Sequence, residues 1–417
     1  MAAADPAAGA ASLPAAAAPR PSLALAAGAM ALLMGLQPVT TDLILPALPA
    51  LAQDLQSPMA PVQLTMSALI LAFGLAQLVW GPLADRHGRR PVLLAGLALY
   101  TLASLGAALA GSVTLVVVWR ALQGAALAAA VVCARAMVRD LYEPREGAMV
   151  MARALTGLGL LAITSPLLGG LLVAGFGWRA SLLSMGLIGA AVGIFITLRL
   201  PETLRQRRPE ATALAPLLRQ LGRTLRHPGF RAWAALICCT YGGLYVFLAG
   251  SGFVLIETIG LSPALAGGVI STCSLAYISG TLLCRRWIPR LGLAASVGRA
   301  AWFTLAAALA MLALAANPKP GVLAVMLPVW LFALGHGVHM PCGQTGVVGP
   351  FPQAAGLASA IAGSDMASVA FAIGLWLGVA LDGTVRPFAL TMAGAALATV
   401  AVAWTSVRRH GDRLEPA

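Results

Sequence analysis

Asp42, Arg120 and Asp365 are ionisable residues that lie within long apolar stretches of the sequence. A charged side chain in hydrocarbon costs at least about 2–3 kcal/mol, so such residues are candidates for function. A carboxyl group that leaves water holds a proton more readily. Asp42 is therefore the predicted proton carrier. The alternative is that Asp42 lies at the outer membrane interface and is only solvated.

Arg120 is predicted to tune proton release. Its guanidinium keeps its proton, so within a membrane it needs a cavity, a carboxylate or carbonyl groups. Gln123 and Gly124 follow at i+3 and i+4 and share its helix face. The alternative is a structural contact between helices without a role in coupling. Asp365 is either a second proton site or a partner for an arginine.

Six polar or aromatic residues of the apolar segments are candidates for contacts with a bulky lipophilic substrate: Gln37, Gln123, Tyr241, Tyr245, His336 and His339. Tyrosine rings can stack on such a substrate, and plain helix packing explains them equally well. His336 and His339 are three residues apart and titrate near neutral pH when solvated, but helix packing or cavity lining is favoured over proton coupling. The six cysteines form no C-x-x-C pair, so no metal is expected.

The polar run from Gly81 to Pro91 reads GPLADRHGRRP, and it combines two glycines and an aspartate with several basic residues. Its two glycines permit close backbone approach and a tight turn. Its aspartate can accept hydrogen bonds at a helix start or pair with an arginine across the loop. An ordinary basic loop requires neither the glycines nor the acid. The predicted gating residues are Gly81, Asp85, Arg86, Gly88, Arg89 and Arg90, which are expected to latch the cytoplasmic side shut.

A second gating element is predicted where Pro166 is followed by Gly169 and Gly170. Proline weakens a helix, and the glycines let a neighbouring helix approach closely. The functional interpretation is a bend that closes a leak path. The alternative is a common kink of a membrane helix.

The composition of the chain is that of a membrane protein, so membrane-spanning elements must position these residues. Of 417 residues, 59% are hydrophobic and 10% are charged, and the mean hydropathy is +0.87. A soluble protein has about 25% charged residues, so a soluble enzyme is excluded. The net charge of +13 is better explained by basic cytoplasmic loops than by nucleic acid binding.

Twelve apolar segments have about the 20 residues that a membrane-spanning helix needs. They cover 23–45, 62–82, 92–110, 113–134, 151–174, 180–199, 231–255, 264–284, 294–316, 321–341, 354–378 and 386–407. Only helices satisfy their own backbone in lipid without closing a barrel, so an all-α bundle is expected.

The connections predict two tandem halves. Arginines concentrate after every second segment, which places both chain termini in the cytoplasm. The predicted domains are a disordered cytoplasmic tail, two six-helix bundles joined by a basic linker, and a second tail: 1–22, 23–200, 201–228, 229–408 and 409–417. We expect the ionisable groups to face an aqueous cleft between the two halves.

The run from Gly81 to Pro91 resembles the signature loop of the major facilitator superfamily. Arg120 to Ala125 is similar to the R-x-x-Q-G motif of proton-driven transporters, and Ser165 to Gly170 is similar to the antiporter motif. Thr41 to Pro49 resembles the end of the first helix in the Bcr/CflA drug-resistance branch. The chain departs from the pattern at three places. Ser165 replaces a glycine, Leu43 and Ile44 replace the usual Met-Tyr or similar pair, and Cys284 replaces the acid of the corresponding loop in the second half.

The resemblance implies a twelve-helix drug/proton antiporter of the bacterial inner membrane. It would work by alternating access, use a proton gradient and no cofactor, and exchange protons for a small lipophilic drug of the chloramphenicol or bicyclomycin type. A monomer in the lipid bilayer, without a nucleic acid partner, is expected. One alternative is proton-coupled uptake of a sugar or nucleoside. A membrane-embedded enzyme is a weaker alternative, and the sequence has no nucleotide-binding G-x-x-x-x-G-K-[ST] motif.

Overall fold

The computed structural model describes residues 21–204, 206–207, 214–317, 320–351 and 354–411, and all regular secondary structure within them is helical. The earlier helices are α1 (Leu23–Asp42), α2 (Leu48–Asp54), α3 (Met59–His87), α4 (Arg89–Ala108), α5 (Val113–Leu141), α6 (Pro144–Phe176) and α7 (Trp178–Arg199). The later helices are α8 (Leu214–Arg226), α9 (Pro228–Phe253), α10 (Pro263–Ala315), α11 (Val322–Val348), α12 (Ala355–Ala380), α13 (Arg386–Val402) and α14 (Arg408–His410).

Eleven helical segments among these residues are long and apolar enough to cross a bilayer. One of them, α10, has 53 residues, which is about 80 Å of helix against a hydrocarbon core of about 30 Å. The backbone of α10 breaks at Gly292, where φ is 77°, a conformation that favours glycine. Helix α10 therefore crosses twice, and the described chain makes the twelve crossings that the sequence predicts.

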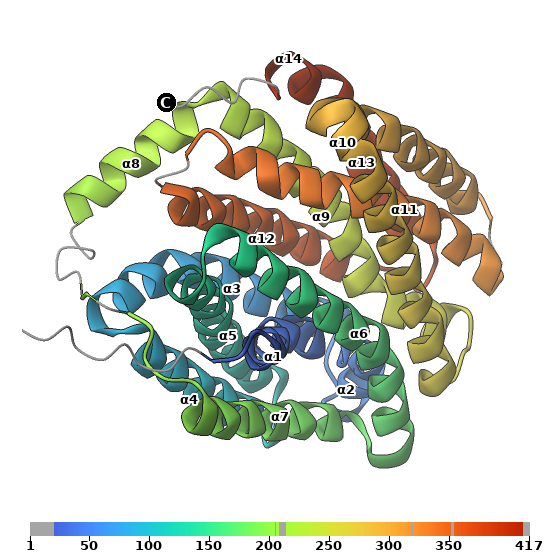
Figure 1. Ribbon diagram of the computed structural model, residues 1–417. Coiled ribbons are helices and arrows are strands. Elements are labelled where there is room, and N and C mark those ends of the chain that lie inside the picture. The colour runs from blue at the N-terminus through green and yellow to red at the C-terminus, as the bar shows by residue number, and fades with distance from the viewer. Residues whose placement is uncertain (1–20, 205, 208–213, 318–319, 352–353, 412–417) are drawn as a thin grey trace, which may run out of the picture.

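The helices pack as two groups, one for each half of the chain (Figure 1). In the first half, α1 packs on α5 and α6, and α4 packs on α5 and α7. In the second half, α9 packs on α11, α12 and α13, and α10 packs on α11 and α13. The seam between the halves consists mainly of α3 against α12 and α6 against α10. The exact domain boundaries stay a prediction.

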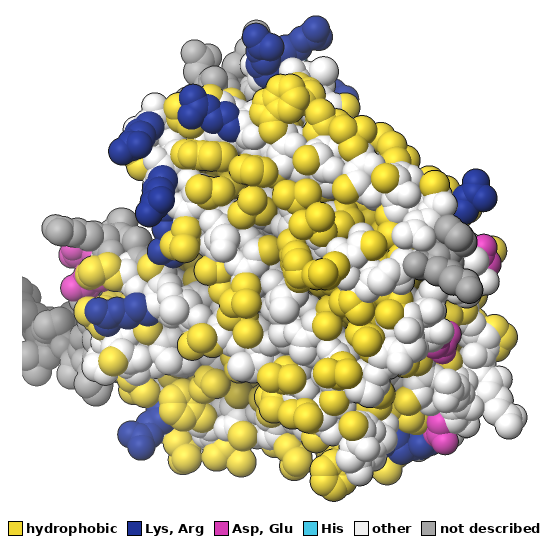
Figure 2. Space-filling view, turned by 90° about the vertical axis from the view of Figure 1, so that its right-hand side faces the viewer, with side chains coloured by type: hydrophobic (Ala, Val, Ile, Leu, Met, Phe, Trp, Pro, Cys, Tyr) yellow, Lys and Arg dark blue, Asp and Glu magenta, His cyan; other side chains and the backbone are white. Residues whose placement is uncertain are grey.

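The surface separates apolar and basic regions. Figure 2 shows a broad face of hydrophobic and uncharged side chains, with Arg side chains along its margins. Many leucines of this kind are exposed, for example Leu102, Leu187 and Leu198. A continuous apolar surface of this size is unfavourable in water, so these side chains must face the lipid bilayer. The molecule is a multi-pass membrane protein.

Helix α1 ends at Asp42, three residues before the end of the predicted segment. Pro46 and Pro49 have no backbone N–H and so favour new helix starts. A 3₁₀ turn, η1 (Leu45–Ala47), and the short α2 follow. The sequence around the two prolines thus puts Asp42 at the last residue of α1, directly before the regular α-helix gives way to the 3₁₀ turn.

The predicted linker contains a helix that the sequence analysis missed. Helix α8 has one apolar and one basic side: Leu221 packs against the second half, and Arg219, Arg223 and Arg226 are exposed. An amphipathic helix of this kind suits the membrane interface. Residues 1–20 and 412–417 of the predicted tails lie outside the described residues.

Candidate transport site and gating elements

The guanidinium of Arg120 is fully buried on α5. Nη1 donates to Oε1 of Gln123 at 2.6 Å, and Nη2 donates to the carbonyl oxygen of Thr40 at 3.1 Å. The sulfur atoms of Met66 and Met185 lie 3.3 and 3.8 Å from its nitrogens. No ion pair in the described part of the chain includes Arg120. A carbonyl group and an amide therefore solvate this charge.

The polar groups around Arg120 form an enclosed network within the first half. Nε2 of Gln123 donates to Oγ of Ser104 at 2.6 Å, and the hydroxyls of Thr40 and Tyr100 lie 2.7 Å apart. All of these side chains are fully buried. In contrast to the expectation from the sequence, Arg120 does not line an aqueous cleft in this conformation, because the surrounding helices leave its guanidinium no exposed surface.

Asp42 lies at the seam between the halves. Its side chain is half-buried, and Oδ1 accepts a hydrogen bond of 2.6 Å from the hydroxyl of Thr41. Tyr241 on α9 and Cys273 on α10 lie close enough to interact electrostatically with the carboxyl group of Asp42. No arginine pairs with Asp42 among the described residues. Its carboxyl group therefore faces the second half without a compensating cation.

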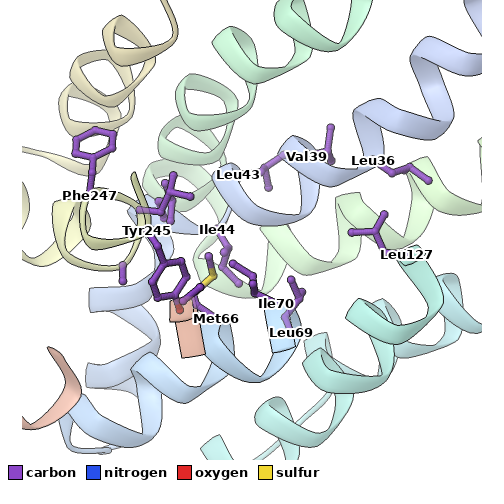
Figure 3. Packing of buried hydrophobic residues seen from close by; sticks show 14 of the residues in the cluster. Leu36, Val39, Leu43, Ile44, Met66, Leu69, Ile70, Leu127, Tyr245 and Phe247 are labelled. Carbon is purple, nitrogen blue, oxygen red and sulfur yellow. The ribbon is translucent and has the colours of Figure 1, made fainter. Parts of the chain in front are cut away.

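Two of the predicted substrate residues, Tyr241 and Tyr245, lie near the same seam. Tyr241 is half-buried beside Asp42, whereas Tyr245 is fully buried. The hydroxyl of Tyr245 lies 2.9 Å from that of Ser67 on α3, and its ring lies beside Met66 in an apolar cluster from both halves (Figure 3). Gln37 is half-buried on α1, and its carbonyl accepts the Thr41 hydroxyl at 3.1 Å.

The antiporter-like glycines of α6 lie where three helices meet. A Cβ on Gly169 would overlap the carbonyl oxygen of Leu43, and one on Gly170 would overlap that of Pro263, in the second half. A Cβ on Gly267 of α10 would overlap the carbonyl of Pro166. The predicted close approach is therefore confirmed. Helix α6 runs continuously through Pro166.

The two histidines of α11 are packing residues. The side chains of His336 and His339 are buried. Nδ1 of His336 lies 2.9 Å from the hydroxyl of Thr240 on α9, and Nε2 of His339 lies 3.0 Å from that of Thr304 on α10. Each ring therefore joins α11 to a different helix, which supports the packing interpretation over coupling.

Asp365 is separate from Arg120 and has no arginine partner in the described ion pairs. It lies half-buried on α12 and lines a pocket of about 420 Å³ with Phe230, Arg231 and Cys238 of α9. The structure thus places the three predicted proton-coupling residues in three different surroundings.

The predicted gating loop forms an ion-pair network. Asp85 pairs with Arg89, as the sequence analysis allowed, and Nε of Arg89 also pairs with Asp140 of α5 at 3.1 Å. Gly88 has a φ of 111°, which makes the predicted tight turn between α3 and α4. Arg90 donates to the carbonyl of Thr197 on α7 at 2.7 Å. Arg86 lies in the last turn of α3.

Two acids that the sequence analysis did not select complete this network. Asp140 pairs with Arg89 and accepts from the hydroxyl of Thr203 at 3.2 Å. Glu202 accepts from the backbone N–H groups of Arg89 and Arg90 at 3.0 and 3.2 Å, and so caps the start of α4. The sequence did hold one signal for these two residues: both acids lie in Arg-rich connections that are predicted to be on the same side of the membrane as the loop.

The expected close approach at Gly81 is wrong. The nearest atom to a Cβ on Gly81 is Cγ1 of Val132 at 4.0 Å, which leaves room for a side chain. In the second half, the Cys284 sulfur lies 3.7 Å from that of Cys342, and no described ion pair corresponds to the Asp85–Arg89 pair.

We expect Asp85→Asn to slow transport without weakening substrate binding. The substitution removes one of two acids on Arg89, and a charge-assisted hydrogen bond of about 1.5 kcal/mol corresponds to a roughly tenfold change in rate. The measurement is the maximal transport rate and the apparent affinity in proteoliposomes. Glu146→Gln, in the first turn of α6, is the control at an exposed acid. An unchanged maximal rate would reject the latch.

The hydrogen bonds between the halves show which end is closed. They join Gln63 to the carbonyl of Ala249 at 2.8 Å, Ser364 to the carbonyl of Gly74 at 2.9 Å and Ser274 to the carbonyl of Ala162 at 3.2 Å. The hydroxyls of Ser67 and Tyr245, 2.9 Å apart, are a fourth such contact. All lie from the middle of the helices to the end opposite Asp85. The Asp85 network stays within the first half. The described structure is therefore hydrogen-bonded shut at the end opposite Asp85.

Comparisons with known proteins agree with this architecture. The family model described as "Major Facilitator Superfamily" matches residues 23–375. "Multidrug resistance protein D" of Escherichia coli (strain K12) is 30% identical over 336 residues, which cover 80% of this chain and 83% of that protein. "Chloramphenicol resistance protein" of Pseudomonas aeruginosa is 30% identical over 325 residues, 77% of this chain and 75% of that protein.

A solved structure extends the comparison to the fold. The crystal structure of a D-xylose-proton symporter superposes with a TM-score of 0.71 at 14% identity, and the match covers 95% of this chain and 99% of that chain. At this identity the likeness concerns the fold alone. The family match and the relatives at 30% identity show that the chain belongs to the Major Facilitator Superfamily.

Proposed function

We propose that this transporter exports lipophilic drugs in exchange for protons, as a member of the Bcr/CflA branch. The names of two relatives, a multidrug and a chloramphenicol resistance protein, support the class of substrate. The proposal of proton coupling rests on one observation. The carboxyl group of Asp42 is half-buried at the seam and has no cationic partner among the described residues.

In the proposed cycle, the halves rock about the seam and expose Asp42 to each side in turn. A proton from outside binds Asp42 and displaces the drug outward. The lower proton activity inside then releases the proton and readmits drug. On the return pass the proton neutralises the carboxyl group, which removes the cost of carrying a buried charge in that step.

Arg120 acts in this proposal as a positioning residue. Its guanidinium holds the carbonyl of Thr40, two residues before Asp42. The last turn of α1 is thereby fixed to α5. Because α5 belongs to the first half, Asp42 moves with that half when the seam opens, and its surroundings change as the second half moves away.

The proposed setting is the inner membrane of a bacterium, with a single chain as the working unit and the proton gradient in place of a cofactor. Both termini and the Asp85 end would face the cytoplasm, since Arg residues concentrate on cytoplasmic loops. In this orientation the hydrogen-bonded end faces outward. Asp365 would be a second proton site or a structural acid.

Everted membrane vesicles test the direction and the energy source together. With an interior more acidic than the medium, vesicles containing the protein should accumulate labelled chloramphenicol, and an uncoupler should abolish the accumulation. Vesicles from cells without the protein are the control. Drug movement out of the vesicles together with protons would instead establish symport and overturn the proposal.

A further inference from the structure

A second pocket, unrelated to the seam, lies at the Arg-rich end of the second half. It has a volume of about 550 Å³, which is within the range of small-molecule sites. It lies between the start of α9 and α14, into which a π-helical turn, η5 (Ala403–Val407), leads. Its lining consists of Pro228, Arg231, Ala232, Ala235, Thr405, Ser406, Arg409 and His410.

The charged side chains of this pocket are of one sign. Arg231 and Arg409 are exposed, and neither takes part in an ion pair or side-chain hydrogen bond among the described residues. Nδ1 of His410 is buried and has no hydrogen-bond partner in the described structure. No acid is among the lining residues. Two arginines and a histidine without partners therefore converge on a space that an anion can enter.

The remaining polar groups favour the same ligand. Ser406 contributes a hydroxyl to the lining, and α9 begins there, so the positive end of its dipole points to the pocket. The carbonyl of Gly411, at the end of the opposing helix, already accepts a hydrogen bond of 3.1 Å from Trp233. The negative end of that helix is thus partly compensated.

The position of the pocket indicates where the anion comes from. Leu218 and Leu225 of α8 are exposed beside the arginines of that helix, an arrangement that suits the membrane interface. Leu225 and Phe230 line the adjoining pocket, which shares Arg231. Asp365, in the adjoining pocket, disfavours a second anion there. An amphiphile thus meets positive charge on one side of Arg231 and apolar side chains on the other.

We propose that this pocket binds the phosphate headgroup of an anionic phospholipid from the cytoplasmic leaflet. The assignment to that leaflet rests on the orientation proposed above, and the binding itself is independent of drug export. Basic pockets between transmembrane helices on the cytoplasmic side suit such headgroups. The bound headgroup would contact both the start of α9 and α14.

Native mass spectrometry of the purified full chain in detergent, titrated with phosphatidylglycerol or phosphatidylcholine, tests the site. Phosphatidylglycerol should bind more tightly. Since each arginine near a lipid surface contributes about a fivefold change in affinity, Arg231→Gln with Arg409→Gln should weaken phosphatidylglycerol binding by about 25-fold. The control is Arg285→Gln with Arg286→Gln, which removes the same charge from exposed positions outside the pocket.

The outcomes separate the sources of the anion. Loss of phosphatidylglycerol binding in the pocket variant alone supports the proposal. Equal losses in both double variants, or no loss in either, overturn it, because the effect would then follow from net charge or not exist. Displacement of the lipid by millimolar inorganic phosphate would assign the pocket to a free anion and also overturn it. Drug transport is not a readout, so failure here leaves the proposed function standing.

Discussion

Asp42→Asn is expected to abolish proton-driven drug accumulation while drug still exchanges down its own gradient. With one proton exchanged per drug, a gradient of one pH unit supports an accumulation of up to about tenfold, since it stores 1.36 kcal/mol per proton. The asparagine cannot carry a proton, so the expected ratio in the variant is about one. Its amide oxygen can still accept the Thr41 hydroxyl, which bonds the carboxylate at 2.6 Å.

Drug accumulation in proteoliposomes with an imposed pH gradient measures this effect, and counterflow of labelled against unlabelled drug measures exchange. Asp54→Asn is the control. Asp54 accepts hydrogen bonds from Trp178 at 3.0 Å and Arg179 at 2.5 Å, at the far end of the first half. That variant should keep its accumulation. Full accumulation by Asp42→Asn would remove Asp42 from the coupling mechanism.

Gly169→Ala is expected to destabilise the packing of α6 against the end of α1 strongly for so small a change. The new Cβ would overlap the carbonyl oxygen of Leu43, and a backbone atom cannot turn aside as a flexible side chain can. Overpacking of this kind costs about 1–3 kcal/mol. Because Leu43 directly follows Asp42, displacement of its backbone should also disturb the proton site. We expect a lower melting temperature and reduced transport.

The same helix provides the matched control. Gly175→Ala adds an identical methyl group to α6 at an exposed position with no atom within 4 Å of the new Cβ. Thermal unfolding in detergent followed by tryptophan fluorescence compares the two variants with the parent. If Gly169→Ala and Gly175→Ala melt together, Gly169 has no special packing role and the close contact at the end of α1 does not limit stability.

The gating loop shows how much a local pattern can predict. The tight turn at Gly88 and the pairing of Asp85 with Arg89 involve residues at most four positions apart, so the sequence contains both. Asp140 and Glu202 lie 51 and 113 residues from Arg89. Their participation depends on how α5 and the end of α7 pack beside the loop, and no local pattern carries that information.

The sequence by itself determined the environment, the number of crossings and the residues too costly to bury without a purpose, because hydropathy and charge act on each segment separately. Only the tertiary structure decided which groups solvate Arg120, that Asp42 faces α9 and α10, and which glycines carry a close contact. These facts depend on the relative placement of helices far apart in the chain. Gly81 and Gly169 are alike in sequence, and only the neighbouring backbone makes one tolerant of a side chain and the other not.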